Sequence, residues 1–402
     1  MPDGSLQTPA ALGRQMPGCP HGSQDGDEVD AAPPFTMPSL ARKGRGAGLN
    51  PAVRFDRTAV EAIDDGWGTL EQAFADLPPL PTTLTKDSAR SALAYNNSPD
   101  IGFDRAVNPY RGCEHGCVYC YARPSHAYLG LSPGLDFETR LLFKPEVAAL
   151  LEKELRKPGS APRPIALGSN TDPYQPVERT LHLTRGVLEV LERFNHPVTI
   201  VTKSAGVLRD LDILQRMAAR DLVRVCLSIT TLDNTLARVM EPRAAAPQRR
   251  LAAMAELARA GVPVAVLAAP MIPGINDAEL ERILNAAAAH GAGHAGYVLL
   301  RLPLEIATLF EDWLKRHYPE RAARVLALVR ETRGGQLYDS RFGIRQSGTG
   351  PYADMLAQRF AIAMKRLGLD RRGGGTKGLD CSQFRVPDAQ PKRAVEAQMA
   401  LF

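Results

Sequence analysis

Three of the six cysteines of this 402-residue chain lie within eight residues, at Cys113, Cys117 and Cys120. The spacing C-x3-C-x2-C places three thiolates on one short loop, where they can bind a single metal centre. A structural zinc site uses four ligands, and the [4Fe–4S] cluster of a simple electron carrier uses four cysteines. No fourth cysteine lies nearby. Three cysteines on a cubane cluster leave one iron without a protein ligand, and that iron is open to a small molecule.

The residues beside the cysteines are compatible with a metal centre. Gly112 and Gly116 allow the backbone to fold tightly around a cluster. Tyr119 precedes the third cysteine, where an aromatic ring can shield the cluster and border an adenine. Two alternatives stay open: a zinc site that His115 completes, or three buried free cysteines, although cysteines rarely gather outside metal or redox sites.

The cysteine spacing, with an aromatic residue before the last cysteine, resembles the motif of the radical S-adenosylmethionine (radical SAM) superfamily. The wider run NPYRGCEHGCVYCYARPSH at 108–126 resembles one branch, uncharacterised proteins related to spore photoproduct lyase. The resemblance covers about residues 40–370. It implies that the three cysteines bind a [4Fe–4S] cluster and that S-adenosylmethionine (SAM) chelates the open iron. One electron, from a flavodoxin-like or ferredoxin-like donor, then cleaves SAM to a 5′-deoxyadenosyl radical, which abstracts hydrogen from a substrate.

The composition indicates a globular chain in a reducing compartment. The hydrophobic fraction is 44%, and the length suits one barrel-sized domain with extensions. The net charge of +5 and the pI of about 8.9 are compatible with a nucleic-acid partner without singling it out. Neither a signal peptide nor an apolar run of about 18 residues appears, so we expect a cytoplasmic protein that makes no membrane contact.

The order of segments predicts one core between loose ends. In chain order we expect a disordered N-terminal tail (1–50), an N-terminal arm (51–101), the core (102–303), a helical extension (304–370) and a flexible basic tail (371–402). Within the arm, 58–64 is expected to be helical. Cys19 and Cys381 lie in the tails and are not assigned to the cluster.

The core repeats a short apolar strand followed by a helix. The strands are expected at 103–107, 164–168, 198–202, 223–229, 262–268 and 297–302, with helices at 183–194, 211–220, 247–259 and 277–290. Further helices are expected in the extension, at 304–317, 320–330 and 351–367. Strands of this kind pair in parallel with right-handed crossovers. Six are fewer than the eight of a closed barrel, so the expected fold is α/β, an open six-stranded parallel (βα)6 partial TIM barrel.

Polar residues where the strands end give a second set of candidates, because ligands of parallel βα folds bind there. The candidates are Ser169, Asn170, Thr171 and Asp172 after the second strand, Lys203 after the third, and Ser228 and Arg243 after the fourth. The first four offer acceptors to the ammonium of SAM. Lys203 or Arg243 offers a cation to its carboxylate, and Ser228 offers a hydroxyl to its ribose. The Gly-Gly-Glu that many superfamily members carry at the first turn is absent. The alternative is a plain polar turn in which Asp172 caps the next helix.

Cys226 is the one candidate for a catalytic side chain of the protein itself. It lies two residues before Ser228 on the same predicted strand, so both side chains face one side. A thiol inside the barrel is able to donate a hydrogen atom to a product radical. Core packing is the competing interpretation, because free cysteines are among the most buried residues. Tyr297 and Arg301, on the last predicted strand, are further candidates to face substrate.

The sequence therefore predicts a radical SAM enzyme of unidentified substrate, with lyase-like repair of a DNA lesion as one option. The alternative is a non-enzymatic protein that bears a metal cluster or zinc and binds nucleic acid. That alternative requires a fourth Cys or His ligand and lacks a SAM pocket.

Overall fold

A computed structural model describes residues 44–55, 80–159, 161–369 and 378–388. These residues all belong to one unit of the chain, Thr36–Phe402. The predicted N-terminal tail up to residue 43, with Cys19, lies outside the described residues. The predicted helix at 58–64 and most of the predicted C-terminal tail lie outside them as well.

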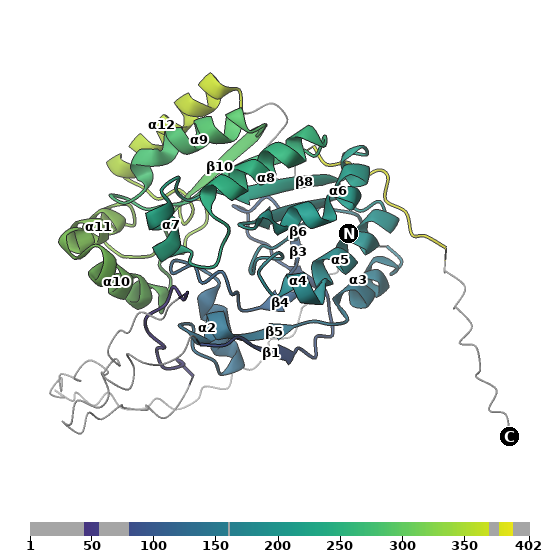
Figure 1. The fold of residues 1–402 in the computed structure, drawn as a ribbon, viewed down its shortest axis with the longest axis horizontal. Helices are drawn as coiled ribbons and strands as arrows, with labels where there is room; N and C mark the ends of the chain where they lie inside the picture. The colour runs from purple at the N-terminus through teal and green to yellow at the C-terminus, as the bar shows by residue number, and fades with distance from the viewer. Residues whose placement is uncertain (1–43, 56–79, 160, 370–377, 389–402) are drawn as a thin grey trace, which may run out of the picture. The chain divides into compact units, whose positions relative to one another are not determined.

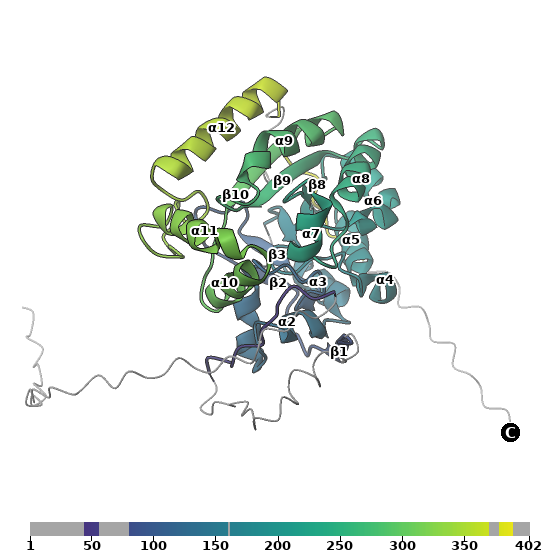
Figure 2. The same ribbon diagram turned by 60° about the vertical axis from the view of Figure 1, so that its left-hand side comes forward.

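The centre of the fold is a mostly parallel sheet of seven strands (Figure 1, Figure 2). In order across the sheet they are β10 (His294–Leu299), β9 (Val264–Met271), β8 (Val223–Ser228), β7 (Val198–Thr202), β6 (Ile165–Leu167), β3 (Arg105–Val107) and β2 (Leu93–Tyr95). The six strands from β3 to β10 pair in parallel, and β2 adds an antiparallel edge. Within the described part of the chain, β10 and β2 are edge strands and no pairing closes a barrel.

The six predicted strands are confirmed as the six parallel strands of this sheet. The last strand begins at His294 rather than at Tyr297. The added residues pair with β9, but none of them is β-branched, so the sequence does not mark them as a strand. The edge strand β2 is missing from the prediction, since Leu93–Tyr95 is three residues long and lies in the predicted arm. Such short strands give no recognisable alternation.

A second, three-stranded sheet holds the start of the cysteine loop and has no counterpart in the predictions. Its order is β1 (Thr83–Lys86), β5 (Arg140–Phe143) and β4 (Tyr110–Arg111). The central strand β5 pairs in parallel with β1 and antiparallel with β4. Because β4 ends directly before Gly112, this sheet fixes where the cysteine loop begins.

Helices that cover the seven-stranded sheet enclose the main apolar core. They are α3 (Val147–Leu155), α5 (Leu183–Arg193), α6 (Leu211–Ala218), α8 (Pro247–Arg259), α9 (Leu280–Ala289) and α12 (Pro351–Leu367). On β8, Val225 and Leu227 belong to this core. Cys226 and Ser228 alternate with them and therefore face the other side of the sheet.

The three helices predicted at 304–317, 320–330 and 351–367 are present, and the first two pack near the cysteine loop. These two helices, α10 (Ile306–His317) and α11 (Pro319–Glu331), lie side by side next to α7 (Asn234–Met240) (Figure 1). Trp313 is fully buried and donates its indole N–H to the carbonyl of Val239 at 3.0 Å. The same apolar cluster includes Val118 and Tyr119 of the loop. No described helix is long and apolar enough to cross a membrane.

The predicted end of the N-terminal tail at residue 50 is wrong for residues 44–50. Ala47 and Leu49 are buried, and the guanidinium of Arg45 donates to the carbonyl oxygens of Glu138 and Leu80. Composition alone predicts a loose segment, because the contacts that order these residues come from far along the chain.

Part of the predicted C-terminal tail is ordered for the same reason. Within 378–388, the Arg385 N–H donates to the carbonyl of Phe194 at 3.0 Å. The ring of Phe384 lies 6.3 Å from that of Phe194, and the edge of His196 meets Phe384 at 5.6 Å. Cys381 lies in this segment, which packs beside the segment before β7 and contributes no residue to the cysteine loop.

Candidate active site

The cysteine loop runs from β4 to the 3-10 helix η1 (Arg123–Leu129). Cys113 and Cys117 are buried, Cys120 is partly exposed, and all three are free thiols. Two backbone hydrogen bonds anchor the loop to other segments: the Cys113 N–H donates to Phe137 O at 2.8 Å and the Val118 N–H to Met240 O at 3.1 Å. These bonds fix the part of the loop that holds Cys113 and Cys117.

Two glycines make this path possible, as predicted. Gly112 and Gly116 have φ of +80° and +67°, in the left-handed region. A Cβ on Gly116 would lie 2.7 Å from Glu138 Oε2, and one on Gly112 would lie 2.6 Å from Leu141 Cδ2. No other residue fits at either position without displacing its neighbours.

A buried carboxylate, Glu138, ties the loop to the N-terminal segment. Its Oε2 accepts the Gly46 N–H at 3.0 Å, and its Oε1 accepts the Ala47 N–H at 2.9 Å. Arg123, also fully buried, pairs with Oε1 at 2.5 Å and donates to Cys117 O at 2.9 Å. We call Glu138, Arg123, Gly46 and Ala47 the Glu138 cluster.

The three thiols suit a [4Fe–4S] cluster better than a single ion. Burial raises the pKa of Cys113, and raises that of Cys117 to about 12, so thiolates here require the charge of a bound metal. No three His, Cys, Asp or Glu side chains among the described residues converge on one ion. In a cubane, each cysteine binds its own iron. His115, which the zinc alternative needs as its fourth ligand, pairs through Nδ1 with Asp172 at 3.2 Å. Metal-binding histidines commonly keep such a carboxylate partner, so this contact does not exclude zinc.

The ends of three neighbouring strands converge on the loop, as the predicted site requires. Asp172 follows β6 and meets His115. Lys203 follows β7, and its ammonium lies 5.7 Å from the centre of the Tyr119 ring. Thr230 follows β8, and its hydroxyl lies 3.2 Å from the Tyr119 hydroxyl. The cysteines therefore lie at the edge of the sheet where ligands of parallel folds bind.

Tyr119 is held by a second buried carboxylate. Its hydroxyl donates to Glu241, which also accepts the Thr230 hydroxyl at 2.5 Å and pairs with the guanidinium of Arg250. Burial would raise the pKa of Glu241, but the charges of Arg250 and Lys203 hold it at about 2. We call Glu241, Arg250, Tyr119 and Thr230 the Glu241 cluster. It fixes the aromatic ring that the sequence places against the metal centre.

Lys203 is the predicted cation with the clearest access to the site. Burial would lower its pKa, but Cys117 and Glu241 hold the pKa above its ordinary value, so the side chain is protonated. Its ammonium makes no hydrogen bond to any described residue. Arg243, the other predicted cation, pairs instead with Glu114 Oε1 at 3.1 Å.

The carboxylate of Asp172 already forms hydrogen bonds within the protein. Its Oδ1 accepts the Thr202 hydroxyl at 2.7 Å and the Tyr174 N–H at 2.9 Å, while Oδ2 accepts the Lys203 N–H at 2.7 Å. Burial would raise its pKa, but His115 and these hydrogen bonds hold the pKa at about 2. The alternative that Asp172 caps the next helix is wrong, because α4 (Glu178–Leu181) begins after Val177 and has no side-chain cap. The carboxylate instead joins the turn after β6 to the end of β7 and to the cysteine loop.

Asn108, which is not among the predicted site residues, forms hydrogen bonds with the other residues after β6. Asn108 Oδ1 accepts the Asn170 N–H at 2.9 Å, and its Nδ2 donates to Ser169 Oγ at 3.3 Å. The Thr171 hydroxyl donates to Tyr110 O at 2.9 Å. Among the described residues the Asn170 side chain has no hydrogen-bond partner, so it is the member of this turn most available to a ligand.

The two candidates on β8 lie deeper on the face away from the helices. Ser228 is buried and its hydroxyl donates to Ala269 O at 3.2 Å. Cys226 is 6% exposed, and burial raises its pKa to about 11, so it is a neutral thiol. The predicted common face of the two residues is confirmed by the alternation on β8.

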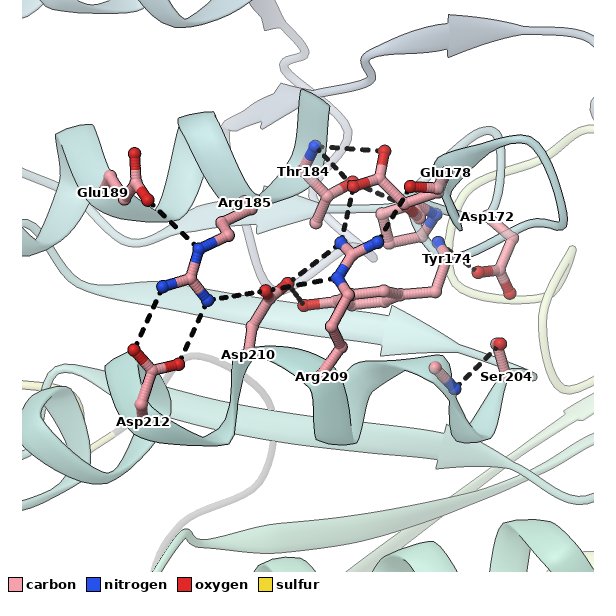
Figure 3. A network of polar contacts seen from close by, with 12 residues as sticks. Asp172, Tyr174, Glu178, Thr184, Arg185, Glu189, Ser204, Arg209, Asp210 and Asp212 are labelled. Atoms are coloured by element: carbon pink, nitrogen blue, oxygen red, sulfur yellow. Dashed lines mark hydrogen bonds and ion pairs between the residues drawn. The ribbon is translucent and has the colours of Figure 1, made fainter. Parts of the chain in front are cut away.

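A layer of ion pairs behind Asp172 stiffens this side of the site (Figure 3). Tyr174 donates its hydroxyl to Asp210 at 3.0 Å, and Arg209 joins Asp210 to Glu178. Glu178 in turn accepts the hydroxyl of Tyr110, three residues before Cys113. The start of the loop is thus braced from the segments that follow β6 and β7.

Tyr121 is an exposed ring at the site that the predictions do not include. It is 50% exposed, its hydroxyl donates to Ser169 O, and the guanidinium of Arg301 lies 4.7 Å from the ring centre. Arg301, which the sequence proposes as a residue that faces substrate, therefore lies next to the residue after Cys120. The place of Tyr121 directly after the third cysteine of the motif is the sequence signal that identifies it.

The comparisons with known proteins agree with this geometry. The family model of the radical SAM superfamily matches residues 107–287. An uncharacterised protein of Mycobacterium tuberculosis is 38% identical over 282 residues, which cover 69% of this chain and 78% of the relative. A radical SAM Nalpha-GlyT isomerase of Pseudomonas phage M6 is 25% identical over 242 residues, covering 58% of this chain and 48% of that protein.

A solved structure shares the fold. It is a variant of spore photoproduct lyase with bound AdoMet and dinucleoside spore photoproduct, 17% identical, with a TM-score of 0.50. The match covers 73% of this chain and 85% of that one. With the cysteine loop at the carboxyl edge of a parallel sheet, and with the family match across this core, the chain belongs to the radical SAM superfamily.

Proposed function

We propose that this chain is an enzyme in which Cys113, Cys117 and Cys120 hold a [4Fe–4S] cluster and SAM binds beside it. When bound, the two cofactors supply a 5′-deoxyadenosyl radical for hydrogen abstraction. The observation that carries the proposal is one fixed loop bearing three free thiols, against which the ends of β6, β7 and β8 converge. We take the six parallel strands to form an open partial barrel around this site.

In this proposal the protein side chains bind SAM and orient it. Lys203 pairs with the carboxylate of SAM. The side-chain amide of Asn170 forms a hydrogen bond with its ammonium, and the hydroxyl of Ser228 forms one with its ribose. Asp172 positions the loop through His115. The Glu241 cluster keeps Tyr119 packed against the metal centre, where it shields the site from water.

Anaerobic reconstitution with iron and sulfide tests the proposal. We expect about four irons per chain, an EPR signal of the reduced cluster that changes when SAM is added, and formation of 5′-deoxyadenosine. The Cys117→Ser variant is the control and should show none of the three. Zinc held by four ligands, or an EPR signal indifferent to SAM, would contradict the proposal and favour a non-enzymatic binding protein.

For the substrate we propose a lesion in nucleic acid, acted on in a lyase-like reaction. Support comes from the fold shared with spore photoproduct lyase, the net charge of +5, and the exposed Tyr121–Arg301 pair, which offers a surface for base stacking. Ultraviolet-irradiated DNA should stimulate SAM cleavage more than untreated DNA, and Tyr121→Ala should weaken that stimulation. Equal cleavage with both DNAs would reject this substrate class.

A further inference from the structure

We propose that a basic pocket beside the cysteine loop is the docking surface of an acidic electron-transfer protein. The pocket has a volume of about 150 Å³, and Arg179, Arg243 and Arg249 line it. His115, between Cys113 and Cys117 in the chain, also lines it. The inference rests on the proposed function, because a cluster that cleaves SAM must receive an electron from outside the chain.

The pocket is positively charged and its charge is largely uncompensated. Arg179 and Arg249 are exposed, and their guanidinium groups form no ion pair or hydrogen bond with any described residue. Arg243 is 35% exposed and shares its charge with Glu114. No acidic side chain is among the described residues that line the pocket. An anionic surface is therefore the natural partner.

The position of the pocket favours an electron donor over nucleic acid. The Arg243 N–H donates to His115 O at 3.3 Å, so the wall of the pocket is attached directly to the segment between two cluster cysteines. Both aromatic rings among the described residues of the lining, those of Tyr174 and His115, are buried, so the pocket lacks the exposed stacking platforms that bind single strands. Electron-transfer complexes bury small areas and depend on complementary charge.

The step itself moves one electron and no atoms. A reduced flavin or iron–sulfur centre in the docked protein loses one electron, and the oxidised cluster on the three cysteines gains it. The arginines make no bond to the reacting centres. They would hold the donor against the segment that joins Cys113 to Cys117.

The test reverses the charge of the two unpartnered arginines with Arg179→Glu/Arg249→Glu. The control is Arg259→Glu, because Arg259 is also exposed and lies at the opposite end of the same helix, α8. An acidic flavodoxin is titrated calorimetrically into the reconstituted full chain at about 0.02 M and 0.3 M NaCl. We expect the double variant to bind at least about tenfold more weakly at low salt, with the difference shrinking at high salt, and the control to match the wild type.

Cluster reduction gives the second readout. Reduction by flavodoxin hydroquinone should slow in the double variant, while reduction by photoreduced deazariboflavin should not. Equal affinities of the double variant and the control for flavodoxin would overturn the docking surface. It would also be overturned if the charge reversals abolish oligonucleotide binding and spare flavodoxin binding. Absence of 5′-deoxyadenosine from wild type driven by deazariboflavin would instead reject the proposed function, and the affinity measurement would still decide the docking surface.

Discussion

Two buried carboxylates lie beside the cysteine loop, and the protein holds them in different ways. Glu138 is paired with Arg123 and accepts two backbone N–H groups, from Gly46 and Ala47. Glu241 is paired with Arg250, and the other donors to it among the described residues are the hydroxyls of Tyr119 and Thr230. The first carboxylate therefore fixes the path of the backbone, and the second fixes side chains beside the cysteine loop.

This difference indicates that equal burial does not imply an equal role. Backbone donors cannot be changed by substitution, so loss of Glu138 leaves buried N–H groups without an acceptor. The partners of Glu241 are side chains, which can be exchanged together with it. Perturbing the Glu138 cluster should therefore appear in stability, and perturbing the Glu241 cluster should appear in catalysis.

The largest effect is expected for Glu138→Ala. It leaves the guanidinium of Arg123 buried without its ion-pair partner and two N–H groups unsatisfied, which should lower the free energy of unfolding by about 3–5 kcal/mol. Urea unfolding measures the change. Glu189→Ala is the control, since Glu189 is 54% exposed and its pair with Arg185 should contribute less than about 1 kcal/mol. A similar small change in both variants would contradict the structural role of Glu138.

The two regions should also respond to acid in different pH windows. Burial lowers the pKa of His126, beside the Glu138 cluster, to about 4 from the ordinary 6.5. Between these values the unfolded chain takes up the proton first, so unfolding becomes easier as the pH falls, by about 3 kcal/mol over the window. Glu241 has its pKa depressed to about 2, so its contribution is complete above the unfolded value near 4.5 and is lost below it.

Unfolding free energies at pH 7, 5.5 and 4.5 check the histidine window, in which Glu241 should contribute little change. His196, whose pKa burial also lowers to about 4, contributes in the same window. The His126→Gln variant should therefore lose only part of the decline between pH 7 and 4.5. A wild-type profile that is flat in this range would show that neither imidazole is held neutral by burial.

Exchanging each ion pair for neutral residues separates the two regions more sharply. In Glu241→Gln/Arg250→Met both members of the ion pair are removed together, so most of the stability should remain, while SAM cleavage falls at least about tenfold, or 1.4 kcal/mol. In Glu138→Gln/Arg123→Met one backbone N–H faces an amide donor, and stability should fall by about 1–3 kcal/mol with cleavage per folded molecule unchanged. If the two double variants behave alike, the division between backbone and side-chain anchoring is wrong.

The smallest effect is expected for Cys226→Ala. The removed sulfur is buried on β8, and the cost in stability should stay near 1 kcal/mol because one heavy atom is lost. If the thiol donates hydrogen to a product radical, the ratio of products should change while 5′-deoxyadenosine formation persists. Normal turnover with an unchanged product ratio would leave Cys226 as a packing residue of the strand that leads to Thr230.

The sequence predicts those parts of the protein that local pattern determines. The cysteine spacing places the loop, and the apolar runs of β7 and β8 place the sheet, because each signal lies within a few residues. Glu138 could not be recognised, since its partners Gly46 and Ala47 lie 92 and 91 residues earlier. Asp172 shows the intermediate case: the polar turn is visible in the sequence, but its engagement by Thr202 and the Lys203 N–H requires the register of neighbouring strands.

The contact of Gly46 with the cysteine loop leaves no room for even one more carbon atom. A Cβ on Gly46 would lie 1.8 Å from Gly116 O, so an added methyl group would push the loop away. The stretch from Gly46 to Glu138 contains β1 to β4 and the cysteine loop itself, so the segment that makes this contact lies far from the cysteines in sequence. A substitution at Gly46 would therefore displace the three thiols although it changes no residue of the cysteine loop.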